Sequence, residues 1–376
     1  AGYPWFLDWG RDALICLRGL IAAGESAIAR DILVQFAVFE RHGTLPNMIR
    51  GNDDSNRDTS DAPLWLIVAA GAYLTTTADT TILEAQADGR TFREVLISIA
   101  THYRSGTPNQ IKMDAASGLV FSPSHFTWMD TKHPTGTPRE GYPIEIQSLW
   151  SRALGIIADL TGDADWRALA DQVAGAILKY YWDPGRGYLS DCLHGSPGTA
   201  AAVAVPDDAL RPNQLLAITL GAIQDPGIGS SVLRAGEQLL VPGAIRSLAD
   251  QQVQHPIPIR WQRRLLNDPR APYWGTYTGD EDTRRKPAYH NGTAWTWLFP
   301  SFCEALVLIH GESAREAALD LLGSAAAVIN RGCLGQVPEV LDGDLPHTAR
   351  GCGAQAWGVA ELVRVLHLLS RSKGER

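Results

Sequence analysis

The feature that most constrains the fold of this 376-residue chain is a pattern that occurs six times along it. Each time, a short motif mixing Trp, Asp, Arg, Asn or Gln with Gly or Pro leads directly into a segment that is apolar on nearly every side of a helix. Helices of this kind are buried ones. We expect these motif-bearing helices at residues 12–23, 62–76, 144–160, 211–223, 291–309 and 352–369.

Between them lie segments with a single apolar stripe, such as the one that carries Trp166, Leu169 and Val173. A single stripe is typical of a surface helix. Such helices are expected at 26–41, 80–104 (interrupted by Gly89), 163–182, 228–240 and 312–330. Buried and amphipathic helices in alternation predict an all-α fold, an (α/α)6 barrel or six-hairpin toroid, with short β-hairpins in its loops. Eleven of its twelve helices are found, and the missing first outer helix is expected before residue 1.

We predict that residues 1–376 form a single catalytic domain. The alternative, two helical domains, needs a linker; the Pro-rich stretch 253–287 is the candidate, but it is dense in Trp and Arg and lacks linker composition. The chain opens inside a loop, "AGYPWFLDWGRD", without an initiator Met. We therefore expect it to be a fragment of a longer chain with an N-terminal domain.

Charge and composition exclude several partners. A net charge of -8 without any Lys/Arg block provides no electrostatic footprint for nucleic acid or an anionic membrane surface. No run of eighteen uncharged apolar residues is present to span a membrane. Twelve tryptophans against eight phenylalanines, many within polar motifs, suit a partner made of sugar rings, although any single Trp is equally well explained as core.

The five cysteines are odd in number, widely spaced and mostly flanked by apolar residues, which indicates reduced thiols and a cytoplasmic location. Cys333, His347 and Cys352 are a conceivable zinc set, but neither C-x-x-C nor H-x-x-x-H spacing is present. We predict no metal and no cofactor.

The amino ends of the buried helices are expected to point to one mouth, where their free N–H groups favour polar and anionic neighbours. Carboxylates dominate the residues that are expected at this mouth. The chain has no G-x-S-x-G elbow and no phosphate-binding glycine loop. Paired carboxylates, together with tryptophans and amides, are the groups that catalyse glycoside hydrolysis and bind the sugar. The residues expected at the mouth are Asp8, Arg11, Asp12, Asp61, Glu145, Asn213, Gln214, His290, Asn291, Glu339 and Gln355.

Five segments carry a family resemblance. In order along the chain they are "AGYPWFLDWGRD", "TWMDTKHPTGTPREGYPIEIQSLW", "RPNQLLAITL", "AYHNGTAWTW" and "GCLGQVPEVLDGDLPHTARGCGAQAWGVAE". Together they resemble the amylo-α-1,6-glucosidase domain of glycogen debranching enzymes. The resemblance implies an (α/α)6 domain that hydrolyses α-1,6-linked glucose at branch points of glycogen or limit dextrin with inversion. It implies Asp130 of "TWMD" as general acid and Glu339 of "GQVPEVLDGD" as general base. Neither the family's glucanotransferase domain nor the N-terminal β-rich domain of its bacterial relatives is found in these residues.

The two carboxylates lie in contrasting local sequences. Trp128 and Met129 precede Asp130 and are expected to desolvate it, which favours the protonated form that an acid needs. Glu339 sits in a loop with Asp342 and Asp344, which we expect to be hydrated and to hold an ionised base. An inverting pair should be about 6.5–9.5 Å apart. The plainer alternative is that Asp130 is an ion-pair partner of Lys132 or Arg139.

Other residues are predicted to bind sugar. The guanidinium of Arg11 can donate two parallel hydrogen bonds, and the carboxylate of Asp12 can accept. Together they suit two neighbouring hydroxyl groups of a sugar. Trp5, Trp9, Trp128 and Trp295 are candidate stacking platforms. The full set of predicted substrate-binding residues is Trp5, Asp8, Trp9, Arg11, Asp12, Asp61, Trp128, Arg139, Glu145, Asn213, Gln214, His290, Asn291, Trp295 and Gln355.

Two alternatives stay open at the level of sequence. One is another α-glucoside hydrolase, trehalase-like or glucoamylase-like, because this barrel hosts several chemistries. The other is a non-catalytic glucan-binding module. The expected partner is a branched α-glucan such as glycogen or limit dextrin.

Overall fold

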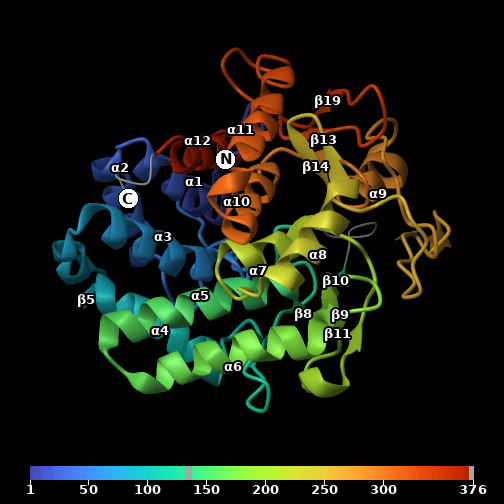
Figure 1. Ribbon diagram of the computed structural model, residues 1–376. Helices are drawn as coiled ribbons and strands as arrows, with labels where there is room; N and C mark the ends of the chain where they lie inside the picture. Colours follow the sequence, from blue (N-terminus) through green and yellow to red (C-terminus); the bar gives the residue numbers. More distant parts are fainter. Residues whose placement is uncertain (132–137, 372–376) are drawn as a thin grey trace.

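The computed structural model describes residues 1–131 and 138–371. Within these residues the chain is helix-rich, and its strands are short and antiparallel (Figure 1). The helices that follow the six sequence motifs, here called the motif helices, are α1 (Gly10–Ala22), α3 (Ala62–Thr77), α5 (Ile144–Thr161), α7 (Leu215–Thr219), α10 (Phe299–His310) and α12 (Ala356–Ser370).

The motif helices contact one another in order. α1 packs on α3, α3 on α5, α5 on α7, α7 on α10 and α10 on α12, and α12 packs on α1. Their buried faces are almost wholly apolar; α3 buries eleven of its sixteen residues. At the α1–α12 contact, Gly19 lies so close that a Cβ built on it would be 2.7 Å from the Cβ of Ala360.

The remaining helices cover this set from outside. α2 contacts α1 and α3, α4 contacts α3 and α5, α6 contacts α5, α8 contacts α7 and α10, and α11 contacts α10 and α12. Three of them begin with a side-chain cap, for example Thr91, which forms a reciprocal capping box with Glu94. Their bounds are α2 (Ser26–Val38), α4 (Phe92–Ser105), α6 (Ala164–Tyr181), α8 (Pro226–Gly236) and α11 (Arg315–Gly323); a short α9 spans Lys286–Tyr289.

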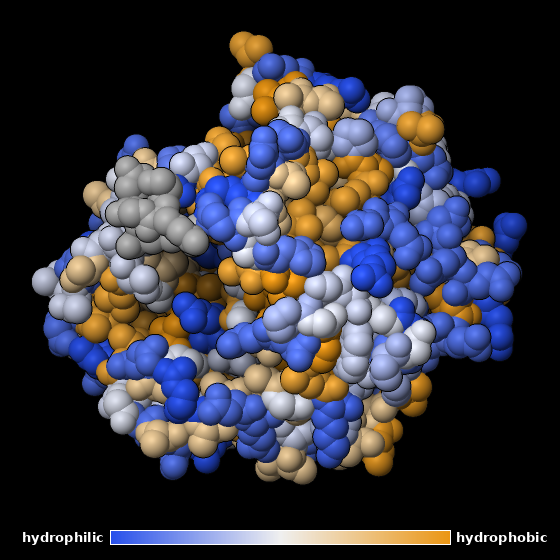
Figure 2. All heavy atoms as spheres, in the orientation of Figure 1, coloured by the Kyte–Doolittle hydropathy of each residue, from blue (hydrophilic) through white to orange (hydrophobic). Residues whose placement is uncertain are grey.

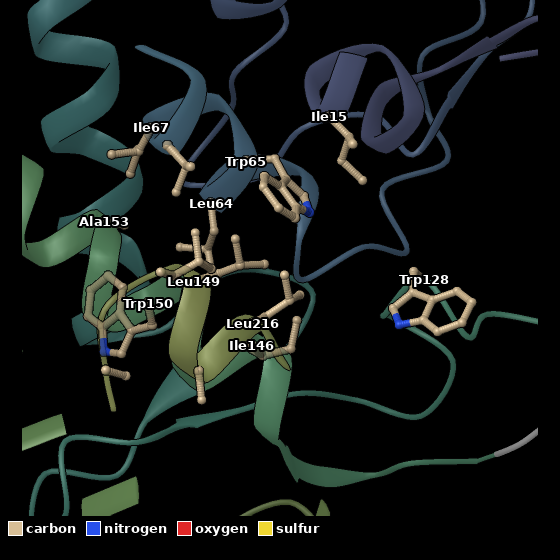
Figure 3. Close-up of a cluster of buried hydrophobic side chains, with 14 of the residues drawn as sticks. Ile15, Leu64, Trp65, Ile67, Trp128, Ile146, Leu149, Trp150, Ala153 and Leu216 are labelled. Atoms are coloured by element: carbon tan, nitrogen blue, oxygen red, sulfur yellow. The ribbon is translucent and has the colours of Figure 1, made fainter. Parts of the chain in front are cut away.

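The core gathers side chains from consecutive motif helices (Figure 3). Trp65 and Trp150 are at most 1% exposed and lie among aliphatic side chains of α1, α3, α5 and α7. At about 25 cal/mol per Å² of apolar surface, burial of this kind is the main stabilising contribution to the fold. The labelled members of this cluster are Ile15, Leu64, Trp65, Ile67, Trp128, Ile146, Leu149, Trp150, Ala153 and Leu216.

The strands lie mainly in the loops that lead into the motif helices, and those of residues 141–246, with α9, lie on the right of Figure 1. The largest sheet has the order β13–β14–β17–β18–β19 and joins the loops before α10 and α12. Its strands are β13 (Leu240–Val241), β14 (Ala244–Arg246), β17 (Ala294–Trp295), β18 (Val340–Leu341) and β19 (Ala349–Arg350).

The other strands form small pairings. A three-stranded sheet has the order β12–β11–β8, and the rest are two-stranded. They are β1 (Gly2–Tyr3) with β20 (Ala354–Gln355), β2 (Asp8–Trp9) with β3 (Met48–Ile49), β4 (Gln86–Ala87) with β5 (Arg90–Thr91), β6 (Lys112–Met113) with β7 (Val120–Phe121), β9 (Trp182–Asp183) with β10 (Tyr188–Leu189), β15 (Arg260–Trp261) with β16 (Arg264–Leu265), and β8 (Gly141–Pro143), β11 (Cys192–His194) and β12 (Val205–Pro206).

Each of the eleven predicted helical segments contains a helix, but three motif helices were predicted too long. The segment 211–223 holds a 3-10 turn and the five-residue α7, because Gly221 adopts a positive φ of 86° after it. The segment 291–309 begins with strand β17, and 352–369 begins with β20. The predicted interruption at Gly89 is confirmed, since this residue turns the β4–β5 hairpin with φ 76°.

Among the described residues, no helix combines the length and apolarity that a bilayer crossing requires, and no cluster of three or more His, Cys, Asp or Glu side chains is placed to hold a metal ion. All five cysteines are free thiols.

Candidate active site

The two carboxylates singled out in the sequence, Asp130 and Glu339, line the same pocket. Asp130 is 24% exposed, and Glu339 is 3% exposed. They are close enough for the charge of Asp130 to raise the pKa of Glu339, in addition to the larger effect of burial. The described residues that line the pocket are Phe6, Trp9, Arg11, Asp12, Trp128, Asp130, Tyr289, Trp295, Glu339, Gln355 and Trp357.

The first turns of two motif helices deliver several of these side chains. Arg11 and Asp12 lie in the first turn of α1, and Trp357 lies in the first turn of α12. None of the six motif helices, all of which lie within the described residues, has a side-chain cap at its amino end. Their leading N–H groups therefore add partial positive charge to the end of the helices where the carboxylates lie.

Asp130 is held by Arg11. The guanidinium of Arg11 donates from Nη1 to Oδ2 of Asp130 at 2.8 Å and from Nε to Oδ2 of Asp61 at 2.5 Å. Burial raises the pKa of Asp130, and the charge of Arg11 and its hydrogen bond partly offset this rise. Because Arg11 donates to Oδ2, its positive charge disfavours a proton on that oxygen and favours Oδ1 as the oxygen to be protonated. Of the two alternative partners predicted for Asp130, Arg139 pairs with other acids and Lys132 lies outside the described residues.

Glu339 is fixed at both oxygens. The hydroxyl of Tyr289 donates to Oε1 at 2.5 Å, and the backbone N–H of Cys352 donates to Oε2 at 3.0 Å. Burial raises the pKa of Glu339 to about 7, although both hydrogen bonds favour the ionised form. The expected hydrated setting is therefore wrong. The cause is non-local: Gly351 packs so tightly that a Cβ on it would be 2.2 Å from Oε2 of Glu339.

Two buried donors in the pocket wall have no partner within the described residues. They are Nη2 of Arg11 and the indole Nε1 of Trp357. An unpaired buried donor costs about 1–3 kcal/mol, so a ligand that accepts from both would be favoured. Asp12 lies beside them, and burial raises its pKa to about 7 despite the charge of Arg11. Two donors next to a carboxyl group match the mixed donor and acceptor character of sugar hydroxyls.

Aromatic rings form the rest of the wall. Trp128 meets Trp295 edge to face at a centroid distance of 5.0 Å, and Tyr289 lies 4.9 Å from Trp295. Trp128 and Trp295 are each 2% exposed, so they act as packed walls with little free face. Phe6 and Trp9, which come from the loop before α1, are half-buried.

The pocket as it stands is small, about 60 Å³. Small-molecule sites generally measure about 300–1,000 Å³. A sugar ring therefore enters only if part of the wall moves. The half-buried lining residues are Phe6, Trp9, Asp130 and Tyr289, and the others are buried.

A layer of buried polar residues supports the pocket from behind. Arg139 donates from Nη2 to Glu145 at 2.6 Å and from Nε to Asp191 at 2.6 Å. Asp191 accepts from Asn213, whose Oδ1 accepts from the indole N–H of Trp128 at 2.7 Å. This network fixes the orientation of Trp128.

The predicted binding residues therefore divide into two groups. Trp9, Arg11, Asp12, Trp128, Trp295 and Gln355 reach the pocket. Trp5 and Asp8 are exposed outside it. Those buried in the supporting layer, outside the lining, are Asp61, Arg139, Glu145, Asn213, Gln214, His290 and Asn291.

Three lining residues were missed in the sequence: Phe6, Tyr289 and Trp357. All three stand inside the quoted motifs "AGYPWFLDWGRD", "AYHNGTAWTW" and "GCGAQAWGVAE". For two of them the adjacent residue was chosen instead: Trp5 beside Phe6, and His290 beside Tyr289. The sequence identified the motifs that reach the pocket. It did not show which side chain of a motif faces the pocket, because that depends on backbone geometry.

The architecture is shared with solved structures. A GH63 mannosylglycerate hydrolase from Thermus thermophilus, in complex with glucose, superposes with a TM-score of 0.62 at 12% identity, covering 96% of this chain and 94% of that one. A rhamnosidase from Klebsiella oxytoca, with rhamnose bound, gives a TM-score of 0.55 at 14% identity, covering 94% of this chain and 56% of that one. At these identities the likeness is one of fold.

A helix-rich fold with a pocket of carboxyl groups, aromatic walls and unpaired donors is that of a glycoside hydrolase. More specifically, residues 1–364 match the sequence model of the amylo-alpha-1,6-glucosidase family, and the chain belongs to this family. The glycogen debranching enzyme of Saccharomyces cerevisiae (strain ATCC 204508 / S288c) is 24% identical over 411 residues. That match covers 82% of this chain and 25% of the yeast protein, so the chain spans about a quarter of that relative's length.

Proposed function

We propose that the chain is an amylo-α-1,6-glucosidase that removes α-1,6-linked glucose at branch points of glycogen or limit dextrin, with Asp130 as general acid and Glu339 as general base. The observation that supports this most is that both carboxylates, far apart in the sequence, line one pocket with raised pKa values. We also propose that the cyclic order of contacts among the motif helices is the ring of an (α/α)6 toroid, which brings these loops to one mouth.

The proton transfers follow from the hydrogen bonds. Asp130 donates its proton from Oδ1 to the glycosidic oxygen while Arg11 binds Oδ2, so the leaving chain departs as a neutral hydroxyl. Glu339 accepts a proton from a water molecule as that water attacks the anomeric carbon. Each oxygen of Glu339 accepts one hydrogen bond from the protein and keeps a second lone pair for that water. Two carboxyl groups about 6.5–9.5 Å apart leave room for it, and this separation is part of the proposal.

The remaining lining groups bind the sugar. Arg11 Nη2 and Trp357 Nε1 donate to hydroxyl oxygens, and Asp12 accepts from hydroxyl groups when ionised. The charge developing on the sugar ring in the transition state is positive, and the ionised Glu339 stabilises it.

The test is glucose release from a branched limit dextrin by the wild type and by Asp130→Asn and Glu339→Gln. Each variant should lose at least about a hundredfold in kcat while folding normally, since general acid or base catalysis contributes about 10²–10⁴-fold. Glu140→Gln is the matched control, because Glu140 lies near Arg139 in sequence but does not line the pocket. Retained activity in either pocket variant removes that residue's assignment.

A second measurement separates inversion from retention. The wild type should release β-glucose first from the α-linked substrate, as followed by proton NMR within seconds of mixing. Release of α-glucose would contradict the proposed roles. A trehalase-like or glucoamylase-like activity predicts faster glucose release from trehalose or from a linear α-1,4 chain than from limit dextrin. A glucan-binding module predicts binding with no release from any of them.

A further inference from the structure

A second cavity, here called the basal cavity, lies at the opposite ends of the motif helices. Its volume is about 530 Å³, within the range of small-molecule sites. The catalytic pocket uses the first turns of α1 and α12, whereas the basal cavity uses their second halves. At a rise of about 1.5 Å per residue, Ile21 of the basal cavity is about 15 Å along α1 from Arg11.

All six motif helices contribute to this cavity. Its apolar wall includes Val68 and Ala72 of α3, Ile218 of α7 and Leu308 of α10. In Figure 2 hydrophobic (orange) side chains lie around a hollow on the left of the molecule, with hydrophilic (blue) side chains beside it.

The charged residues that line the basal cavity are all basic. Arg18, Arg152, Arg364 and Arg371 line it together with His367, and no Asp or Glu does so within the described part of the chain. Glu361 and Glu304 lie behind the wall: Arg18 donates to Glu361 at 2.8 Å, and Arg364 donates to Glu304 at 2.6 Å.

This arrangement leaves positive charge without an anion. Arg152 and Arg371 are exposed and take part in no ion pair among residues 1–131 and 138–371. Four guanidinium groups thus face two carboxylates. Burial and the charge of Arg364 also lower the pKa of Arg18, as expected where positive charge is in excess.

Two buried polar atoms of the wall have no partner within the described residues: Nε of Arg18 and Oγ1 of Thr219. Arg18 is 8% exposed, and its guanidinium is held over the ring of Trp65 at 4.9 Å, so it is a fixed group. Both residues line the cavity, and an unpaired N–H of a fixed guanidinium group favours an oxygen anion as ligand.

Helix dipoles do not account for three of these arginines. The carboxyl end of a helix favours cations, but the effect is confined to about the last turn. Arg18 and Arg364 lie at least a full turn before the ends of α1 and α12, and Arg152 lies in the middle of α5. Their convergence on one cavity therefore calls for a ligand.

We propose that the basal cavity binds a small organic phosphate, with its phosphate group on the arginines and its apolar part against the aliphatic wall. Arginine matches the geometry of phosphate oxygens through paired N–H groups, and the apolar wall suits the attached organic group. The site is separate from the proposed catalytic pocket, and the proposal does not depend on the reaction assigned to that pocket.

The test is calorimetric titration of the protein with inorganic phosphate and with phenyl phosphate, against sodium chloride of equal ionic strength. Saturable binding is expected for both probes and tighter binding for phenyl phosphate, whose ring contacts the aliphatic wall. The variant Arg152→Gln/Arg371→Gln should weaken binding at least about tenfold without changing Tm in the absence of probe, because both side chains are exposed. Arg234→Gln/Arg331→Gln removes the same charge from exposed positions outside the cavity and should bind like the wild type.

Three results would overturn the proposal. The first is no saturable binding of either probe beyond the chloride control. The second is unchanged binding in Arg152→Gln/Arg371→Gln. The third is displacement of the probe by glucose, or loss of binding in Arg11→Gln, either of which would place the anion in the catalytic pocket instead.

Discussion

The hydroxyl of Tyr289 lies 2.5 Å from Oε1 of Glu339 and donates a hydrogen bond to it. Tyr289 stands at the end of the short helix α9, is in ring contact with Trp295, and lines the pocket. A hydrogen bond to a carboxylate favours its ionised form. Tyr289 is therefore a positioning residue that both orients the proposed base and opposes the effect of burial on its pKa.

Removal of this hydroxyl should be visible in the pH profile. In Tyr289→Phe the pKa of Glu339 rises further above 7, so the acidic limb of kcat/KM moves to higher pH. At pH 6 we expect a loss of about tenfold or more, and at pH 8 a smaller loss. The measurement is glucose release between pH 5 and 9. Tyr277→Phe is the control, since Tyr277 packs on Tyr289 at 5.4 Å. An acidic limb that stays in place in Tyr289→Phe would contradict this role.

Gly351 packs against Oε2 of Glu339, the carboxylate oxygen that Tyr289 does not contact. It has a positive φ of 66°, and a Cβ there would fall 2.2 Å from Oε2 of Glu339. Gly351→Ala should therefore displace the carboxylate and reduce kcat by at least about tenfold, with about 1–2 kcal/mol lost in unfolding free energy from backbone strain.

Gly335→Ala is the matched control for this change. Gly335 also has a positive φ, 71°, but a Cβ there meets no atom within 4 Å. It should lose similar stability and keep full activity. Equal losses of kcat in the two variants would show that strain, not the contact with Glu339, is responsible.

The close α1–α12 contact depends on Gly19, which has no side chain. A Cβ on Gly19 would lie 2.4 Å from the carbonyl oxygen of Ala360, which is backbone and cannot rotate away. Gly19→Ala should therefore destabilise the protein by about 1–3 kcal/mol through overpacking, in spite of the better helix propensity of Ala. Urea denaturation measures this. In Gly323→Ala, where the added Cβ meets nothing within 4 Å, stability should be unchanged or higher.

The sequence predicted the order of the helices because each motif helix is apolar on nearly every side and each covering helix has one stripe. It failed at the start of α10, where the apolar run A-W-T-W-L-F fits strand or helix equally well until β14 and β18 pair with β17. Apolar character alone does not give burial either: Ile28 of α2 is 50% exposed because the helix turns Ala29 and Leu33 inward.

At the site, the residue types could be predicted and their surroundings could not. Arg11, Asp130 and Glu339 reach one pocket as their motifs suggest. Glu339 was expected to be hydrated because Asp342 and Asp344 follow it in the chain. Its actual neighbours are Tyr289, from the end of α9, and Cys352, from across the β18–β19 hairpin. Desolvation is set by such non-local packing, which local composition does not record.

The burial of Glu339 also has a consequence for stability. Its pKa is about 7 in the folded state against an ordinary value of 4.5, so the folded protein binds a proton more tightly than the unfolded chain. The stability from this group is fully present below pH 4.5 and is lost as pH rises to about 7. This difference corresponds to on the order of 3 kcal/mol.

Glu339→Gln removes this dependence because Gln does not titrate. The free energy of unfolding of the variant relative to the wild type should therefore increase by about 2–3 kcal/mol from pH 5 to pH 8, whatever constant cost the amide imposes at the N–H of Cys352. Urea denaturation at the two pH values measures it, with Glu140→Gln as the reference substitution. If the relative stability is the same at both pH values, Glu339 titrates in its ordinary range, and the acidic limb of activity should then lie near about pH 4–5.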